Sequence, residues 1–127
     1  MKKREADFGL LFRHWIRANP RYSAAFELKQ TTTNSFPFNE VKDHQIEWLQ
    51  AANSDKGMLY KIPDDSRGIK PFDYVYLRKA GALIFIKYPG CFHGISVENF
   101  IYEKERSIRK SLTEARARDI AVVSVDL

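Results

Sequence analysis

The stretch AFELKQ, residues 25–30, places an acidic and a basic side chain two positions apart. Residues i and i+2 of a β-strand project from the same face, so we expect the carboxylate of Glu27 and the ammonium of Lys29 to stand side by side. Metal-assisted phosphodiester hydrolysis uses such a pair: the carboxylate binds Mg²⁺, and the lysine orients the attacking water or stabilises developing charge. The alternative is a surface ion pair, since acid-x-Lys also occurs as EVK at 40–42.

A second carboxylate lies on the inward side of the first predicted helix, residues 3–18. The apolar residues of this segment recur at i, i+3, i+4 and i+7: Phe8, Leu11, Phe12 and Trp15. At 100° per residue, Glu5 lies within about 20° of Phe12, at the N-terminal end of this stripe. A carboxylate facing the core needs a metal ion or a basic partner, because an unpaired buried charge is very costly. A solvated Glu5 in a frayed first turn is the alternative.

An amide faces inward on the second predicted helix, which ends at about residue 52. The apolar stripe of this helix consists of Val41, Trp48, Leu49 and Ala52. Gln45 lies within about 40° of Val41 on the helical wheel, where an aliphatic residue would be expected. Gln45 is therefore a candidate to support the substrate or Lys29. The alternative is a core amide that bonds to the backbone.

The remaining pattern predicts a single α/β domain over residues 1–127. Residues 24–31 alternate between an apolar and a polar side, which predicts a strand with one dry and one wet face. Further strands are predicted at 57–62, 73–77 and 82–88, and further helices at 96–110 and from 111 onward. The last two strands, joined by RKAG, are predicted to form a hairpin. The predicted order is α-β-α-β-β-β-α-α, a small mixed β-sheet flanked by helices.

Basic residues gather at the two ends of the chain. Residues 1–21 contain six Lys or Arg and two acids, a net charge of +4, and residues 103–118 contain six and three, a net of +3. The middle is balanced, so the distribution favours a polyanion held by the ends. Solvated faces of basic helices are the alternative. The expected phosphate contacts are Lys2, Lys3, Arg4, Arg13, Arg17, Arg106, Arg109, Lys110 and Arg116.

The composition argues against several other classes of protein. No apolar run approaches the roughly 20 residues that a bilayer span needs. The first nine residues lack the apolar segment of a signal peptide, so none is expected. Cys91 is the single cysteine, which excludes an internal disulfide and fits a reducing cytoplasm. Between Gly90 and Phe92 it is expected to be a buried structural thiol.

The candidate residues carry a resemblance to a known family. AFELKQT, the loop SFPF and the helix opening on HQIEWL resemble the RecU-type Holliday junction resolvases, of the PD-(D/E)xK nuclease superfamily, over residues 24–50. The segment from KIPDDSRGIKPFDYVYL to SLTEARARDIA is more loosely similar to small phage-type resolvases.

This resemblance implies a restriction-endonuclease-like core and cleavage of branched DNA by a homodimer with Mg²⁺ or Mn²⁺. It also implies a place in the bacterial cytoplasm, with a phage as a possible source of the gene. It assigns Glu27 and Lys29 to the E-x-K element, Glu5 to the acid of the first helix and Gln45 to the polar residue of the next helix.

One departure from the superfamily concerns the second metal-binding acid. The superfamily supplies an Asp just before the E-x-K strand, whereas residues 18–26, ANPRYSAAF, contain no acid. Three interpretations remain: the site is inactive, Glu5 suffices with Glu27, or another carboxylate replaces the Asp. Asp73 in KPFDYVYL is the candidate replacement and third metal ligand, because it opens a strand in a Pro-x-Asp setting. Its strand is expected to lie beside residues 24–31; an Asp that caps a turn is the alternative.

Other functions compete with junction cleavage. A non-catalytic nucleic-acid-binding module would keep the fold after losing the Asp. A nuclease of the same superfamily would act on linear ends, mismatches or flaps instead of junctions. A protein-interaction subunit fits the basic ends least well.

Overall fold

The computed structural model describes residues 4–22 and 24–127, with the side chains of residues 1–6 and 23 outside the description. The elements in chain order are α1 (Arg4–Ala18), β1 (Ala25–Gln30), β2 (Ser35–Pro37), the 3-10 turn η1 (Phe38–Glu40), α2 (Asp43–Ala52), β3 (Met58–Lys61), β4 (Tyr74–Leu77), β5 (Ala82–Tyr88), β6 (Cys91–Ser96), α3 (Val97–Arg106), β7 (Ser111–Thr113), α4 (Glu114–Ile120) and β8 (Val123–Asp126).

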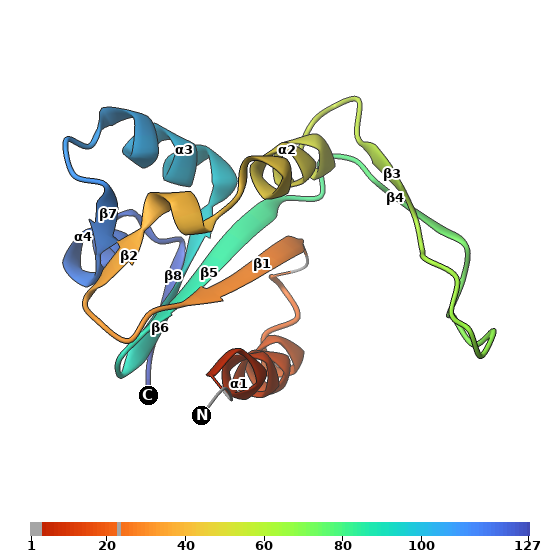
Figure 1. Ribbon diagram of the computed structural model, residues 1–127, viewed down its shortest axis with the longest axis horizontal. Coiled ribbons are helices and arrows are strands. Elements are labelled where there is room, and N and C mark those ends of the chain that lie inside the picture. Colours follow the sequence, from red (N-terminus) through yellow and green to blue (C-terminus); the bar gives the residue numbers. More distant parts are fainter. Residues whose placement is uncertain (1–3, 23) are drawn as a thin grey trace.

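A four-stranded mixed sheet of order β1-β5-β6-β8 forms the centre of the molecule. β1 runs parallel to β5, while β5–β6 and β6–β8 are antiparallel. Helix α1 covers one face of this sheet, and α2, α3 and α4 cover the other (Figure 1). The predicted α/β class, with a mixed sheet flanked by helices, is therefore confirmed.

β5 is the central strand because its side chains are buried on both faces. Ile84 and Ile86 are fully buried in the larger core, beneath α2, α3 and α4. Phe85 points to the opposite face, where its ring lies 4.9 Å from that of Phe12 in an edge-to-face contact. Strands covered on both faces read as continuous apolar runs, as ALIFI does here.

The predicted order of strands is wrong in its second half. The expected hairpin of 73–77 with 82–88 does not form: β5 turns instead at Gly90, in the left-handed region with φ 83°, and pairs with β6. Pairing within the central sheet buries β5 on both faces, which removes far more apolar surface than pairing with the exposed β4. The short strands β2, β7 and β8 and the whole of β6 were also absent from the predicted order.

β3 and β4 form a separate two-stranded ribbon, with Met58 opposite Leu77 and Lys61 opposite Tyr74. We call residues 56–79 the arm, because the ribbon extends away from the body of the molecule (Figure 1). Within one chain, the expectation that the strand after Asp73 lies beside β1 is therefore wrong. β1 pairs with β5 instead, in a register that sets Glu27 beside Ile84.

Gly94 of β6 provides a test of how tightly the sheet packs. A Cβ added there would lie 2.7 Å from Cε2 of Phe85 and 2.9 Å from Cγ1 of Val123. Overpacking of this kind costs about 1–3 kcal/mol, so we expect Gly94→Ala to lower the free energy of unfolding by that amount in urea denaturation. The matched control is Gly9→Ala in α1, where nothing lies within 4 Å and the helix should gain up to about 1 kcal/mol. Equal stability of the two variants would contradict the packing described here.

Candidate active site

Glu27 and Lys29 project from the same face of β1, as the strand periodicity predicts. Nζ of Lys29 lies 3.3 Å from Oε2 of Glu27, with side chains 17% and 25% exposed, respectively. Their neighbours across the parallel pairing are Ile84 and Ile86, both fully buried. The predicted wet face is therefore wrong in one respect: the pair is half-buried against an aliphatic core. Both charges are more strongly coupled there than at an exposed surface.

Gln45 joins this pair from α2. Its Nε2 donates a hydrogen bond of 2.9 Å to Oε2 of Glu27. Its Oε1 accepts a hydrogen bond of 2.9 Å from the backbone N–H of Lys42, at the start of the helix. The backbone contact fixes the amide orientation so that a donor faces the carboxylate. The inward-facing amide of the sequence is thus a side-chain bridge between α2 and β1, and not a core amide bonded to backbone alone.

The three side chains form a small cluster that we call the ELK–Gln site: Glu27, Lys29 and Gln45. The hydrogen bond from Gln45 and the ion-pair contact with Lys29 both use Oε2, and Oε1 accepts no hydrogen bond among the described residues. Val41, just before α2, and Leu49 within it are both buried in the larger core and anchor the helix there. Trp48, predicted to belong to this stripe, is 47% exposed and instead packs its ring against Tyr60 of the arm.

The other two predicted metal ligands lie apart from this cluster or outside the description. Asp73 precedes β4 in the arm, where its carboxylate is 73% exposed and lies 3.1 Å from Nζ of Lys70. Lys70 also contacts Asp64, so the arm holds a small ion-pair network of its own. The side chain of Glu5 lies outside the described part of the chain. The structure thus brings together Glu27, Lys29 and Gln45, and does not bring Asp73 to them within one chain.

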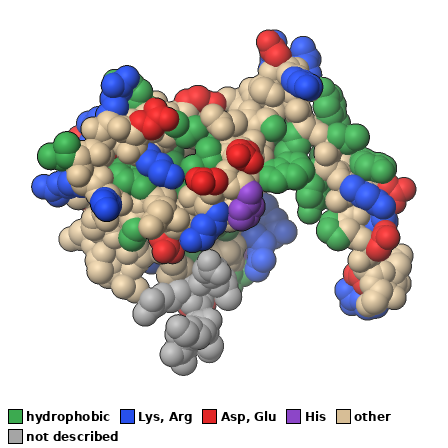
Figure 2. Space-filling view, turned by 45° about the horizontal axis from the view of Figure 1, so that its top comes forward, with side chains coloured by type: hydrophobic (Ala, Val, Ile, Leu, Met, Phe, Trp, Pro, Cys, Tyr) green, Lys and Arg blue, Asp and Glu red, His purple; other side chains and the backbone are tan. Residues whose placement is uncertain are grey.

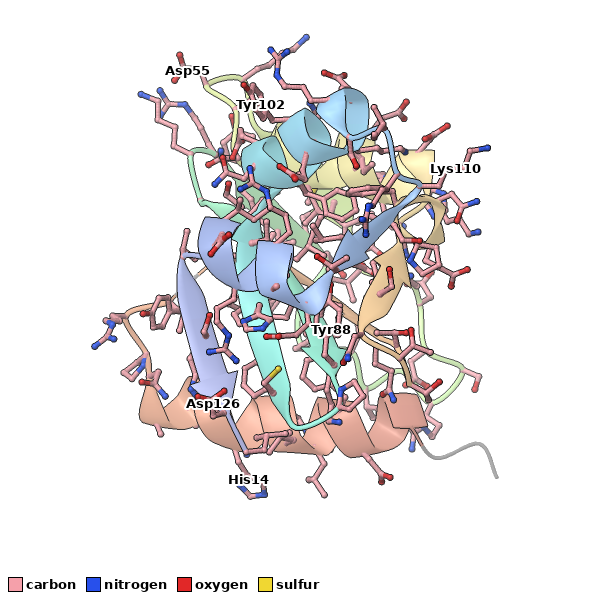
Figure 3. All side chains as sticks on the ribbon, turned by 90° about the vertical axis from the view of Figure 1, so that its left-hand side faces the viewer. His14, Asp55, Tyr88, Tyr102, Lys110 and Asp126 are labelled. Carbon is pink, nitrogen blue, oxygen red and sulfur yellow. The ribbon has the colours of Figure 1, made fainter. Side chains whose placement is uncertain are left out.

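The predicted phosphate contacts lie on both faces of the sheet. Arg13 and Arg17 are exposed on α1, whereas Arg109 and Lys110 are exposed beyond α3. Figure 3 shows this separation, with Lys110 on one side of the sheet and His14 of α1 on the other. The side chains of Lys2, Lys3 and Arg4 lie outside the described residues.

Two of the remaining arginines have intramolecular partners. Arg116 donates to both carboxylate oxygens of Glu103, at 2.7 Å and 3.2 Å. The guanidinium of Arg106 lies 4.1 Å above the ring of Tyr102. Among the predicted phosphate contacts on the same side of the sheet as Glu27 and Lys29, Arg109 and Lys110 are therefore the exposed cations whose side chains have no partner among the described residues.

A second polar cluster, on the same face of the sheet, was not predicted. Nε2 of His93 lies 2.7 Å from Oε2 of Glu114 and 3.5 Å from Sγ of Cys91, and its Nδ1 lies 2.8 Å from Ser124. The ligand atoms of Cys91, His93 and Glu114 are close enough to one another to hold a metal ion. The Nε of Arg118 donates a hydrogen bond of 3.1 Å to the same oxygen of Glu114, so this carboxylate already has a cationic partner within the protein. Alternation along CFHGIS gave no sign of it, because Glu114 comes from a distant helix.

Burial governs the ionisation of this cluster. It raises the pKa of the Cys91 thiol, and hydrogen bonding to Glu114 raises it further. The higher pKa favours the protonated thiol, and the expected burial of Cys91 is confirmed.

The His93 cluster lies near the ELK–Gln site but apart from it. Lys29, Ile86 and His93 are paired neighbours on three adjacent strands, so the cluster lies about two strand spacings, roughly 10 Å, from Lys29.

An acid-x-Lys strand thus lies at the edge of a mixed α/β sheet, bridged by an amide from the next helix. The sequence profile of the family Recombination protein U (RecU) matches residues 19–83, slightly more than half of the chain. The chain therefore belongs to the RecU family. The matched region contains the ELK–Gln site, the arm and Asp73, and it leaves out α1 with Glu5. Comparison with curated proteins gives no match. None of the described helices is both long and apolar enough to cross a membrane.

The His93–Glu114 contact predicts a specific dependence of stability on pH. The hydrogen bond from His93 lowers the pKa of Glu114 below its ordinary value of 4.5. A carboxyl group with a lower pKa in the folded state contributes stability above that value, and this contribution is lost as pH falls through the folded-state pKa. We expect Glu114→Gln to show a smaller loss of stability between neutral pH and pH ~3 than the wild type, as measured by urea unfolding.

Glu105 of α3 provides the matched control, because it is exposed and makes no ion pair among the described residues. Glu105→Gln should retain the full pH dependence of the wild type. If Glu114→Gln lost as much stability with falling pH as the wild type, the contact with His93 would not contribute to stability.

Proposed function

We propose that this chain is a metal-dependent endonuclease that cleaves the phosphodiesters of branched DNA, in the manner of a Holliday junction resolvase. The observation that carries the proposal is the ELK–Gln site in a chain of the RecU family. A surface ion pair alone explains neither the half-burial of Glu27 and Lys29 nor the donor that Gln45 directs at the same carboxylate oxygen.

The donor chemistry of this site suits a hard divalent cation. Mg²⁺ binds oxygen ligands and keeps several waters, so protein sites commonly supply one or two carboxylates. Oε1 of Glu27 would provide one such oxygen, since it accepts no hydrogen bond among the described residues. When bound there, Mg²⁺ or Mn²⁺ would act as a Lewis acid toward the scissile phosphate. Glu5 and Asp73 remain the predicted further ligands.

The protein groups around Glu27 have separate roles. The ammonium of Lys29, restrained beside the carboxylate and mostly buried, orients an attacking water or stabilises charge that develops on the phosphate. Gln45 holds the carboxylate in position, because its own carbonyl is anchored on the Lys42 backbone. Such restraint preserves geometry during the reaction, which is how pre-organised sites gain rate.

Substitution of the acid and the lysine tests the enzymatic proposal. In a nicking assay on a synthetic four-way junction with Mg²⁺, we expect Glu27→Gln and Lys29→Ala each to lower the cleavage rate by about 10²-fold or more. Junction binding in a gel-shift assay should persist, because the predicted phosphate contacts are other residues. Glu40→Gln, in the EVK triplet of the same spacing, is the matched control and should cleave normally.

Binding without cleavage by the wild type, in both Mg²⁺ and Mn²⁺, would favour the non-catalytic DNA-binding module instead. Equal cleavage of a linear duplex and a junction would favour a nuclease for other DNA structures.

The position of the cations predicts which surface meets DNA. Glu27 and Lys29 project toward the face covered by α2 and α3, so we expect Arg109 and Lys110 to contact phosphates near the cut. The double substitution R109E/K110E should weaken junction binding, and the slope of log affinity against log salt should fall by about 0.9 for each lost contact. The comparison variant is R13E/R17E on α1, which we expect to have the smaller effect. The opposite ranking would place the DNA on the α1 face.

A further inference from the structure

We propose that two copies of this chain exchange arms, and that Asp73 of each arm completes the ELK–Gln site of the other copy. This inference rests on the proposed nuclease function and names the partner that the site requires. Three observations carry it: an incomplete site at an open sheet edge, an arm that is not covered by its own body, and a fixed arm direction.

The site is incomplete and lies on an open edge of the sheet. Glu27 is the single carboxylate among the described side chains that contacts Lys29 or Gln45. β1 is an edge strand: its described pairing is with β5 alone, so its other edge presents unpaired N–H and C=O groups. Such an edge accepts an additional strand from another chain. A strand added there would lie directly beside Glu27.

The arm supplies both a strand and a carboxylate. β4 pairs with β3 on one edge and leaves its other edge open among the described elements. Asp73 immediately precedes β4, and its carboxylate is 73% exposed, with Lys70 of the same arm as its ion-pair partner. Addition of β4 to the edge of β1 would bring Asp73 within one strand spacing, about 4.8 Å, of the strand that carries Glu27.

The arm also needs a protein partner. An isolated two-stranded ribbon is marginally stable in water. Large apolar side chains of this arm are nevertheless exposed: Leu59 61%, Ile69 62%, Phe72 55%, Tyr74 54% and Tyr76 57%. At roughly 100 Å² or more for each side chain covered, two exchanged arms would together bury about 1,000 Å², which is the scale of a stable interface.

The surface chemistry favours a second copy of the chain over DNA as the occupant. All three carboxylates of the arm pair with its own cations: Asp65 with Arg67, and Asp64 and Asp73 with Lys70. Lys56, Lys61 and Arg78 of the arm make no ion pair among the described residues. At its base, an apolar hollow is lined by Glu47, Trp48, Ala51, Met58 and Leu59. Figure 2 shows hydrophobic side chains along the arm and where it joins the body. Leu59 and Ile69 are aliphatic, fit a protein surface and offer no stacking face to a base. Phe72, Tyr74 and Tyr76 do offer such faces, so the aliphatic pair carries the preference for a protein partner.

The base of the arm argues against closure onto its own body. Backbone hydrogen bonds of 3.0 Å and 3.1 Å join Lys79 to Ser54 and Ala80 to Ala52, and the Tyr76 hydroxyl donates to the Lys56 carbonyl at 2.7 Å. Gly57 has φ 79°, and a Cβ there would lie 2.6 Å from the Leu77 carbonyl, so the two strands are in tight contact at the hinge. The arm is thereby held pointing away from the β1 of its own chain.

Site-directed cross-linking tests the proposal independently of cleavage. The variant E27C/D73C, in a C91S background, is treated with a short bismaleimide and run on a denaturing gel. Exchange of arms predicts a covalent dimer that requires both cysteines, and the single variants E27C and D73C are the controls. An intramolecular cross-link, or a wild type that sediments as a monomer, would overturn the proposal.

Complementation between inactive variants provides the catalytic test. E27Q and D73N are each expected to be inactive, and co-refolding them should restore about one quarter of wild-type junction cleavage. Heterodimers make up half of a random mixture, and each has one complete site out of two. Active D73N, or an inactive mixture in which heterodimers are verified by two different tags, would refute the contribution of Asp73 in trans. A cross-linked E27C/D73C dimer, together with a wild type that does not cut DNA, would instead refute the nuclease function and leave arm exchange standing.

Discussion

The parallel pairing of β1 with β5 is the constraint on which the rest of the site depends. Its register places Glu27 and Lys29 beside Ile84 and Ile86, on a row of side chains that the larger core keeps dry. A shift by one residue would send both charges to the α1 face, among Phe12, Phe85 and Phe92. Since unpaired charges in that aromatic cluster would be very unfavourable, the same hydrophobic pattern that builds the sheet also fixes the acid–lysine pair.

Much of the site could be predicted from the sequence because it depends on local periodicity. Alternation along AFELKQ put Glu27 and Lys29 on one face, and the helical wheel turned Gln45 inward; both features are present in the structure. These patterns involve neighbours within one element, so they hold whichever strands later pair. The half-burial of the pair could not be predicted, because it depends on Ile84 and Ile86 from a strand more than fifty residues away.

Strand pairing was the part that local patterns could not predict. RKAG between two strand-like runs suggests a hairpin, yet β4 and β5 belong to different sheets. Which strand joins the central sheet depends on how much apolar surface each one buries. Of β4 and β5, only β5 has buried side chains on both faces. β7 and β8 have three and four residues, so they carry almost no periodic signal of their own. The His93–Glu114 contact is likewise formed by the fold and not by spacing.

The tight hinge at Gly57 has a consequence for the geometry of cutting. In the proposed pair of chains with exchanged arms, the distance and angle between the two ELK–Gln sites would depend on how each arm leaves its body. Gly57, with no side chain, allows the carbonyl of Leu77 to approach at a distance that any Cβ would forbid. The length and direction of the arm would then act as a fixed spacer between two scissile phosphates on opposite strands. A glycine that touches neither DNA nor metal would in this way determine whether two nicks fall at matching positions.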